Sequence, residues 1–162
     1  MTVTWPEPVE RVASFLRETG AEARLEELPE TAPTAAGVAD LLGCTLGQIV
    51  KSLVLLADGT PVVALVPGDR RADTGKVAHL LEARRVAVAT AQEVVAATGF
   101  SPGAVSPFPL ERVATVLVER TLLRHPLVWA GAGSERHVVS TTPNELVRLT
   151  RGRVEDVVAE SP

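Results

Sequence analysis

The sequence predicts a single α+β domain, spanning residues 1–162, whose sheet is mixed and mostly antiparallel. Its length suits one domain with a substantial core, and no repeat, low-complexity linker or shift in composition marks a second one. An apolar hairpin stands near the middle of the chain, and three further strand-like runs lie closer to its end. Segments with helical spacing are interspersed among these runs, and this mixture is what indicates the α+β class.

The hairpin, from Ile49 to Val66, consists of two apolar runs separated by Asp58-Gly59. That dipeptide readily adopts the positive φ values of a tight hairpin turn. Because both runs are almost wholly apolar, we expect most side chains of both strands to be buried. One lysine, Lys51, interrupts the first run, and an ammonium buried there without a partner would be costly. Lys51 is therefore the first candidate functional residue.

Five segments have apolar residues at helical spacing, and most have a capping residue before them or a glycine after them. The predicted helices run from Pro6 to Gly20, from Thr34 to Gly43, from Asp73 or Thr74 to Leu81, from Thr90 to Gly99, and from Thr142 or its neighbour to Leu149.

Shorter runs between these helices predict the remaining strands, with a short tail from Val154 to Val158. The strands are expected at Ala23 to Leu28, Val86 to Ala89, Val113 to Val118, Leu127 to Ala130 and His137 to Ser140. Gly99 to Pro109 carries three prolines and two glycines in eleven residues, so we expect a structured loop there.

The composition of the chain argues against several classes of function and location. The net charge of −4 and the pI of about 5.4 argue against nucleic-acid binding through bulk electrostatics, which needs many cations. No apolar run approaches the roughly 18 to 20 residues of a membrane-spanning helix, and no secretory signal is visible. Cys44 is the only cysteine, which excludes an internal disulfide and fits a reducing cytoplasm.

Several segments resemble known functional motifs, but each lacks a feature that the chemistry of the motif requires. Gly99 to Gly103 matches the G-x-S-x-G pattern of a nucleophile elbow, but Pro102 has no N–H for an oxyanion hole. The histidines and Cys44 lack the spacing of metal ligands, and Gly131 to Ser134 lacks the third glycine of a dinucleotide-binding fingerprint. We therefore expect no metal and no cofactor, and we read Cys44 as a small buried thiol.

Three features remain: Lys51, the loop at 99–109, and a predicted glycine turn from Gly131 to Ser134. Each has a purely structural explanation. Lys51 could be a strand-end lysine whose stem covers apolar surface. The loop could close a corner of the sheet, and the glycines could form an ordinary turn.

Taken together and in order, these features resemble the YbaK/ProX family of aminoacyl-tRNA deacylases, which stand free or are inserted in bacterial prolyl-tRNA synthetases. The resemblance covers nearly the whole chain, which makes it far more specific than any one motif. It rests on Ile49-Val50-Lys51-Ser52-Leu53, Val66-Pro67-Gly68-Asp69-Arg70-Arg71, Thr98-Gly99-Phe100, Gly103-Ala104-Val105-Ser106-Pro107, Gly131-Ala132-Gly133-Ser134 and Thr142-Pro143-Asn144-Glu145-Leu146.

The resemblance implies a mixed, barrel-like sheet with packed helices, and Lys51 as the functional residue. It also implies a G-x-x-x-P loop at the aminoacyl end and a glycine segment lining the same pocket. The implied binding residues are Gly103, Ala104, Val105, Ser106, Pro107, Gly131, Gly133 and Ser134. Around Ser134 to His137 the chain departs from the cysteinyl-tRNA-clearing members, which have a more basic, glycine-containing segment, so the resemblance carries the class of activity and not the amino acid.

The implied reaction is chemically simple, because an aminoacyl ester is already activated and needs only a positioned attacking group and a stabilised oxyanion. We expect Lys51 to bind the carbonyl or the terminal phosphate, and the amides near Gly103 and Ala104 to hold the ester. Ser106 and Ser134 would orient the substrate. Either water or the substrate's own side chain could attack.

Two other functions stay open. The same pocket could bind an aminoacyl end or a nucleotide without turnover, or it could hydrolyse a small activated ester or thioester. The expected partner is aminoacyl-tRNA. Because the pI is low, we also expect help from prolyl-tRNA synthetase or an elongation factor.

Overall fold

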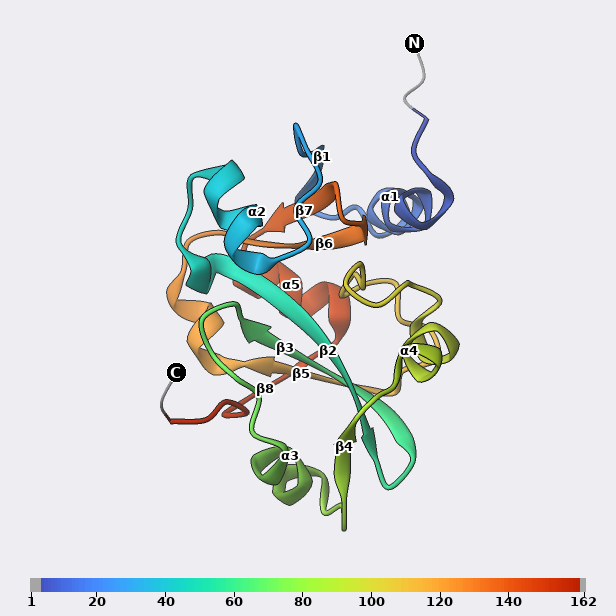
Figure 1. Ribbon diagram of the computed structural model, residues 1–162, viewed down its shortest axis with the longest axis vertical. Coiled ribbons are helices and arrows are strands. Elements are labelled where there is room, and N and C mark those ends of the chain that lie inside the picture. The colour runs from blue at the N-terminus through green and yellow to red at the C-terminus, as the bar shows by residue number, and fades with distance from the viewer. Residues whose placement is uncertain (1–3, 161–162) are drawn as a thin grey trace.

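The computed structural model describes residues 4–160, which form one mixed eight-stranded sheet with helices packed around it (Figure 1). The helices are α1 (Glu7–Thr19), α2 (Ala35–Leu42), α3 (Thr74–Leu81), α4 (Ala91–Thr98) and α5 (Pro143–Thr150). The strands are β1 (Ala23–Glu27), β2 (Ile49–Ala57), β3 (Thr60–Pro67), β4 (Val86–Val88), β5 (Thr115–Glu119), β6 (Val128–Ser134), β7 (His137–Thr141) and β8 (Arg153–Glu155).

The strand order is β1-β7-β6-β2-β3-β5-β8, with β4 paired to β2 beside this path. Four strand pairings are antiparallel and three are parallel. Because β1 and β8 end the path, the sheet is an open half-barrel, and the predicted α+β class with a mixed, mostly antiparallel sheet is confirmed. No helix of the described chain has both the length and the apolar character needed to cross a membrane.

Strand β2 is where the sheet forks. One edge pairs with β3 along nearly the whole strand. The other edge pairs with β6 at Ile49 and Val50 and with β4 from Leu55 to Ala57. Between these two contacts, residues 51–53 have no second strand partner within the described chain. The fork therefore leaves a short piece of strand edge around Lys51 without a neighbouring strand.

The predicted hairpin is confirmed in detail. Asp58 and Gly59 have φ values of 48° and 83°, the pair of positive values that a two-residue hairpin turn requires. The Asp58 carboxylate accepts backbone N–H bonds from Arg84 and Arg85 and so ties the turn to the start of β4. Strand β3 lies between β2 and β5 and is buried on both faces, as its apolar sequence indicates.

Alternate residues of β3 serve two different core clusters, as expected for a strand covered on both sides. Val63 and Leu65 pack in the larger cluster with residues of α1, α5 and the loop at 99–109. Val62, Ala64 and Val66 pack in the smaller cluster with α3 and the C-terminal segment. The sheet is thus held from both faces, which fixes β2 and the fork.

The predicted first residues of the helices are confirmed, and so are the glycines predicted to end three of them. Both signals depend only on residues that are close together in the sequence. The side chains of four capping residues accept an N–H from the first turn of α2, α3, α4 and α5: Thr34, Asp73, Thr90 and Thr142. Gly20, Gly43 and Gly99 adopt the left-handed conformation that ends α1, α2 and α4. Helices α3 and α5 end instead at Glu82 and Arg151, which take the same conformation without being glycine.

The prediction of a turn at Gly131 to Ser134 was wrong. These residues belong to β6, and the chain reverses only after Ser134, before β7 begins at His137. The pairing of β6 with β7 shifts register between Gly131 and Ser134. Gly133, at φ 99°, allows this β-bulge, and the bulge explains why a glycine-rich segment can remain in a strand. Cys44, expected to be buried, is only half-buried.

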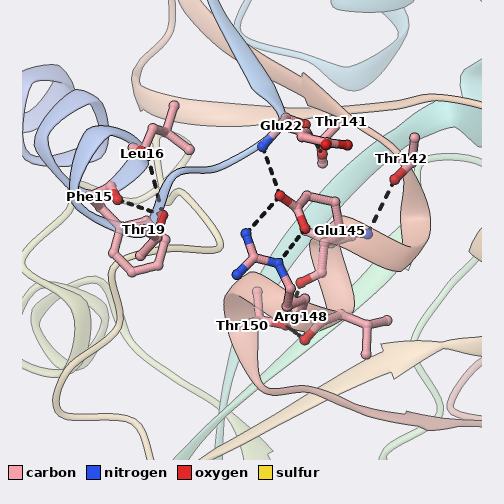
Figure 2. A network of polar contacts seen from close by, with 11 residues as sticks. Phe15, Leu16, Thr19, Glu22, Thr141, Thr142, Glu145, Arg148 and Thr150 are labelled. Carbon is pink, nitrogen blue, oxygen red and sulfur yellow. Dashed lines mark hydrogen bonds and ion pairs between the residues drawn. The ribbon is translucent and has the colours of Figure 1, made fainter.

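Glu145, which forms an ion pair with Arg148 on α5, also links this helix to the segment between α1 and β1 (Figure 2). The Glu145 carboxylate accepts from Arg148 at 2.5 and 2.8 Å and from the backbone N–H of Glu22 at 2.7 Å. The carbonyl of Glu22 in turn accepts from the Thr141 hydroxyl at 2.8 Å. Glu145 therefore links the N-terminal and C-terminal parts of the fold.

Candidate functional site

A cavity of about 280 Å³ opens at the fork of the sheet, between β2, the start of α2, β6 and the loop at 99–109. Five of the residues predicted from the sequence line it: Lys51, Gly103, Val105, Gly131 and Ser134. These residues are up to 83 positions apart, from Lys51 to Ser134, and it is the half-barrel that brings them together. The lysine and the proline-glycine loop therefore meet in one cleft.

The other four predicted residues are not among the described residues that line this cavity. Ala104, Ser106 and Pro107 are buried behind the loop surface. The Ala104 N–H donates to the Ser101 carbonyl at 3.0 Å, and the Ser106 hydroxyl accepts from the Phe108 N–H at 3.5 Å. The Ala104 N–H is therefore already bonded within the loop, and the Ser106 hydroxyl lies on a fully buried residue.

Gly133 faces the start of α1 instead of the cavity. A Cβ placed on it would lie 2.8 Å from the backbone of Pro8, closer than carbon atoms can approach without a shift. Its glycine is explained by this contact and by its positive φ, since both exclude a side chain there. Gly133 thus shapes the strand that carries Gly131 and Ser134.

Lys51 is half-buried at the wall of the cavity, and its Nζ donates to the Arg70 carbonyl at 2.8 Å. Burial lowers the pKa of Lys51, Asp69 opposes that shift, and Arg71 adds to it. An ammonium has three N–H donors, and within the described chain Arg70 accepts from one of them. The others are available to a carbonyl or phosphate oxygen in the cavity.

The loop that receives Lys51 is itself held by the C-terminal segment. The Arg70 guanidinium donates to the Ala159 carbonyl, and the Ala159 N–H donates to the Arg71 carbonyl at 2.9 Å. An isolated bridge pairs Ala72 with Val158. The acceptor of the Lys51 ammonium is therefore fixed by contacts from the far end of the chain.

Ser134 and His137, which line the same cavity as the lysine, form a second polar group, of which the sequence analysis identified only Ser134. The Ser134 hydroxyl lies 2.6 Å from His137 Nδ1 and accepts the Arg136 N–H at 3.0 Å. His137 is buried, with Glu27 3.5 Å from its Nε2 and the Trp5 ring edge-on at 5.5 Å. A histidine three residues after a serine, across a tight turn, is the signal that would have found it.

Ser52 is the other residue that the sequence analysis missed. It lines the cavity next to Lys51, and its hydroxyl is buried with no hydrogen-bond partner among the described residues. A buried hydroxyl without a partner costs free energy, so a polar ligand group is its natural complement. The signal that would have found Ser52 in the sequence is a single serine beside the lysine in an otherwise apolar strand.

The cavity therefore combines apolar walls with one ammonium, one carboxylate, three hydroxyls and a buried imidazole, an arrangement suited to a small, polar, activated group. Within residues 4–160, no three His, Cys, Asp or Glu side chains come together as metal ligands. Gly99 ends α4, and no helix follows Ser101 directly, so the nucleophile-elbow interpretation remains excluded.

Comparison with known proteins identifies the family. The aminoacyl-tRNA editing domain matches residues 29–149, a span that contains every residue lining the cavity. This chain belongs to the aminoacyl-tRNA editing domain family. The family expected from the sequence is thereby confirmed.

Editing-domain relatives resemble the chain in sequence and in structure. A solved structure described as a "putative trans-editing enzyme for prolyl tRNA synthetase" is 34% identical, with a TM-score of 0.90 over 96% of this chain and 99% of that one. The "Putative Cys-tRNA(Pro)/Cys-tRNA(Cys) deacylase EbsC" of Enterococcus faecalis is 26% identical over 78% of each chain. The proline–tRNA ligase of Bacillus licheniformis is 36% identical over 59% of this chain, which spans only 17% of that ligase.

Proposed function

We propose that this editing-domain protein is a trans-editing hydrolase that cleaves the ester of mischarged aminoacyl-tRNA. Family membership supports this function, as do the names of the relatives above. The observation that carries it is the Lys51 ammonium, held by Arg70 at the wall of a cavity that the glycine loop closes. The aminoacyl ester would lie against that wall.

The geometry supports hydrolysis without a protein nucleophile. The ester is already activated, so the protein has only to orient it and to stabilise the oxygen that becomes negative. In our proposal Lys51 stabilises the carbonyl oxygen or the terminal phosphate. Ser52 and Ser134, which lie in the same cavity, orient the aminoacyl group and the attacking water or side chain.

In our proposal the loop at 99–109 meets the substrate through its backbone, and none of its side chains takes part in catalysis. Gly103 and Val105 line the cavity, whereas the buried Ala104, Ser106 and Pro107 keep the loop in shape. A glycine at φ 82° lets the chain approach the cavity without a Cβ in the way. We propose that Gly103 marks the closest approach of this loop to the ester.

Replacing Lys51 tests the proposal. Lys51→Met keeps the apolar stem and removes the charge, so the fold should persist while deacylation falls by about 10²-fold or more. Lys51→Arg, which retains a cation, should recover part of the rate. Release of amino acid from a panel of mischarged tRNAs measures both, and an unimpaired Lys51→Met enzyme would refute the assignment.

The same panel separates the alternatives. A binding module would retain mischarged tRNA without releasing amino acid, and a general esterase would act equally on esters that lack tRNA. With a net charge of −4 the protein as a whole does not attract tRNA electrostatically. We propose that a prolyl-tRNA synthetase or an elongation factor presents the aminoacyl-tRNA, which affinity purification with each candidate tests.

A further inference from the structure

The turn between β6 and β7 carries a charged side chain that the function proposed above does not use. Glu135, in this turn, lines the same cavity as Lys51, so the cavity wall holds an anion as well as a cation. Glu135 is exposed, and it forms no ion pair with any residue of the described chain. Its charge is therefore available to a ligand in the cavity.

The other side chains of this turn are already engaged. The Ser134 hydroxyl and His137 Nδ1 lie 2.6 Å apart, and the Arg136 guanidinium donates to two carbonyls of the segment after β1, each at 3.0 Å. The backbone of the turn is fixed as well, because the Glu135 carbonyl accepts the Ala32 N–H at 3.0 Å. The fold thus holds the turn in place without using the Glu135 carboxylate as an ion-pair partner.

The Glu135 carboxylate lies close to the loop at 99–109. Its Oε1 is 3.9 Å from the position that a Cβ on Gly103 would occupy, and Gly103 lines the same cavity. In the function proposed above, the ester lies beside Gly103 and Lys51. A carboxylate at this place is within reach of a cation carried by the atoms next to the ester.

An aminoacyl ester carries such a cation. Its α-ammonium and its carbonyl oxygen are attached to adjacent carbon atoms, so the groups that bind them must line the same small space. The carbonyl oxygen suits the ammonium of Lys51, and the α-ammonium suits a carboxylate, to which it can donate charge-assisted hydrogen bonds. Lys51 and Glu135 therefore complement the two polar groups of one acyl group.

We propose that Glu135 binds the α-ammonium of the aminoacyl group and makes the enzyme selective for substrates with a free amino group. The inference rests on the proposed function and adds a specificity-determining residue to it. A peptidyl-tRNA has a neutral amide at the same nitrogen and lacks the charge that Glu135 binds. The contact therefore favours hydrolysis of aminoacyl-tRNA over hydrolysis of peptidyl-tRNA.

Alanyl-tRNA and lactyl-tRNA are a matched pair of probes, because nitrous acid converts the α-ammonium of the first into the hydroxyl of the second and keeps the ester. Glu135→Gln should lower kcat/KM for alanyl-tRNA by about tenfold and leave kcat/KM for lactyl-tRNA unchanged. Each comparison is between two enzymes on one substrate, so the different reactivities of the two esters cancel. If the panel of mischarged tRNAs identifies a better substrate, its α-hydroxy analogue is made in the same way.

A second variant and a matched control make the test specific. Glu135→Lys reverses the charge and should lower kcat/KM for alanyl-tRNA further than Glu135→Gln does, because a cation repels the α-ammonium. Glu30→Gln is the control: Glu30 is an exposed glutamate close in sequence to Ala32, and it is not among the described residues that line the cavity. This control should hydrolyse both substrates as the wild type does.

Three outcomes would overturn the inference: equal losses on alanyl-tRNA and lactyl-tRNA, which indicate a structural role; unchanged hydrolysis of alanyl-tRNA by both Glu135 variants; or a loss in Glu30→Gln as large as that in Glu135→Gln. Either Glu135 variant keeps the test valid if the other does not fold. Failure of the hydrolase proposal looks different, because the wild type then releases no amino acid from any mischarged tRNA, and the inference falls with it.

Discussion

In the proposed function the chemistry depends on one residue, Lys51, a lysine in an apolar strand at the point where the sheet forks. Its pKa is lowered by burial, which alone would favour the neutral amine. Asp69 acts in the opposite direction and supports the charged form. The loop after β3 thus supplies both the carbonyl that binds the ammonium and the carboxylate that helps to keep it charged.

Asp69→Asn should therefore move the pH dependence of deacylation. Without the carboxylate the pKa of Lys51 falls further, so the ammonium is lost at a lower pH and the alkaline decline of kcat/KM begins earlier. Arg71→Ala, which removes a neighbouring positive charge, should shift that decline to higher pH. Rates corrected for spontaneous ester hydrolysis measure both shifts, and movement in the same direction would contradict this account.

Replacing Ser52 distinguishes a structural role of its hydroxyl from a role in binding the substrate. Its buried hydroxyl has no partner in the described chain, so Ser52→Ala should stabilise the protein by up to about 1 kcal/mol. If the hydroxyl serves the substrate, the same change should reduce kcat/KM. Denaturant unfolding and deacylation of the same sample test both effects, and lower stability with full activity would show that Ser52 is structural.

Among the elements, the bulged strand β6 supplies part of the cavity wall, including Gly131 and Ser134. Gly133 has a φ of 99°, and a Cβ on it would lie 2.8 Å from the backbone of Pro8. Both features are fixed by strands and a helix from distant parts of the chain. A rigid backbone, not a flexible side chain, occupies the space, so the clash cannot be relieved cheaply.

Gly133→Ala should accordingly destabilise the fold by about 2 to 3 kcal/mol, from backbone strain and overpacking combined. Gly20→Ala is the matched control: Gly20 also has a positive φ, of 60°, but no atom lies within 4 Å of its added Cβ. It should cost about 1 kcal/mol. Equal losses in urea unfolding would show that strain alone, without the contact at Pro8, explains Gly133.

The elements predicted correctly are those whose signals are local. Thr90 and Glu93 form a reciprocal cap within four residues, and Asp58-Gly59 sets its hairpin turn by its own backbone preferences. The bulge at Gly131 to Ser134 depends on pairing with β7 and on the approach of α1, neither of which is written in the segment itself. Read alone, its glycines indicate a turn.

At the scale of the whole molecule, the site depends on long-range closure of the half-barrel. Lys51 and the loop at 99–109 could be identified from the sequence, but their distance could not, because it is set by how β2 pairs with β6 and β4. The approach of Glu27 to His137 was hidden for the same reason, since Glu27 lies on β1. The sequence therefore identified candidate site residues, but not the residues that lie next to them in the fold.

The Glu145 network links the two ends of the chain, and its strength should depend on pH. Arg148 and the Glu22 N–H hold the pKa of Glu145 well below its ordinary 4.5, at about 2. Because the folded pKa is depressed, the carboxylate contributes stability above pH 4.5, and that contribution is lost as the pH falls towards 2.

Glu145→Gln should therefore be less stable than the wild type at pH 7, with a difference that shrinks steadily between pH 4.5 and pH 2. Glu18→Gln, on the exposed surface of α1, is the matched control and should show no such dependence. Urea unfolding across this pH range measures the difference. A gap between wild type and Glu145→Gln that persists unchanged at pH 2 would mean that the side-chain amide, and not the lost charge, weakens the contact between α5 and the segment before β1.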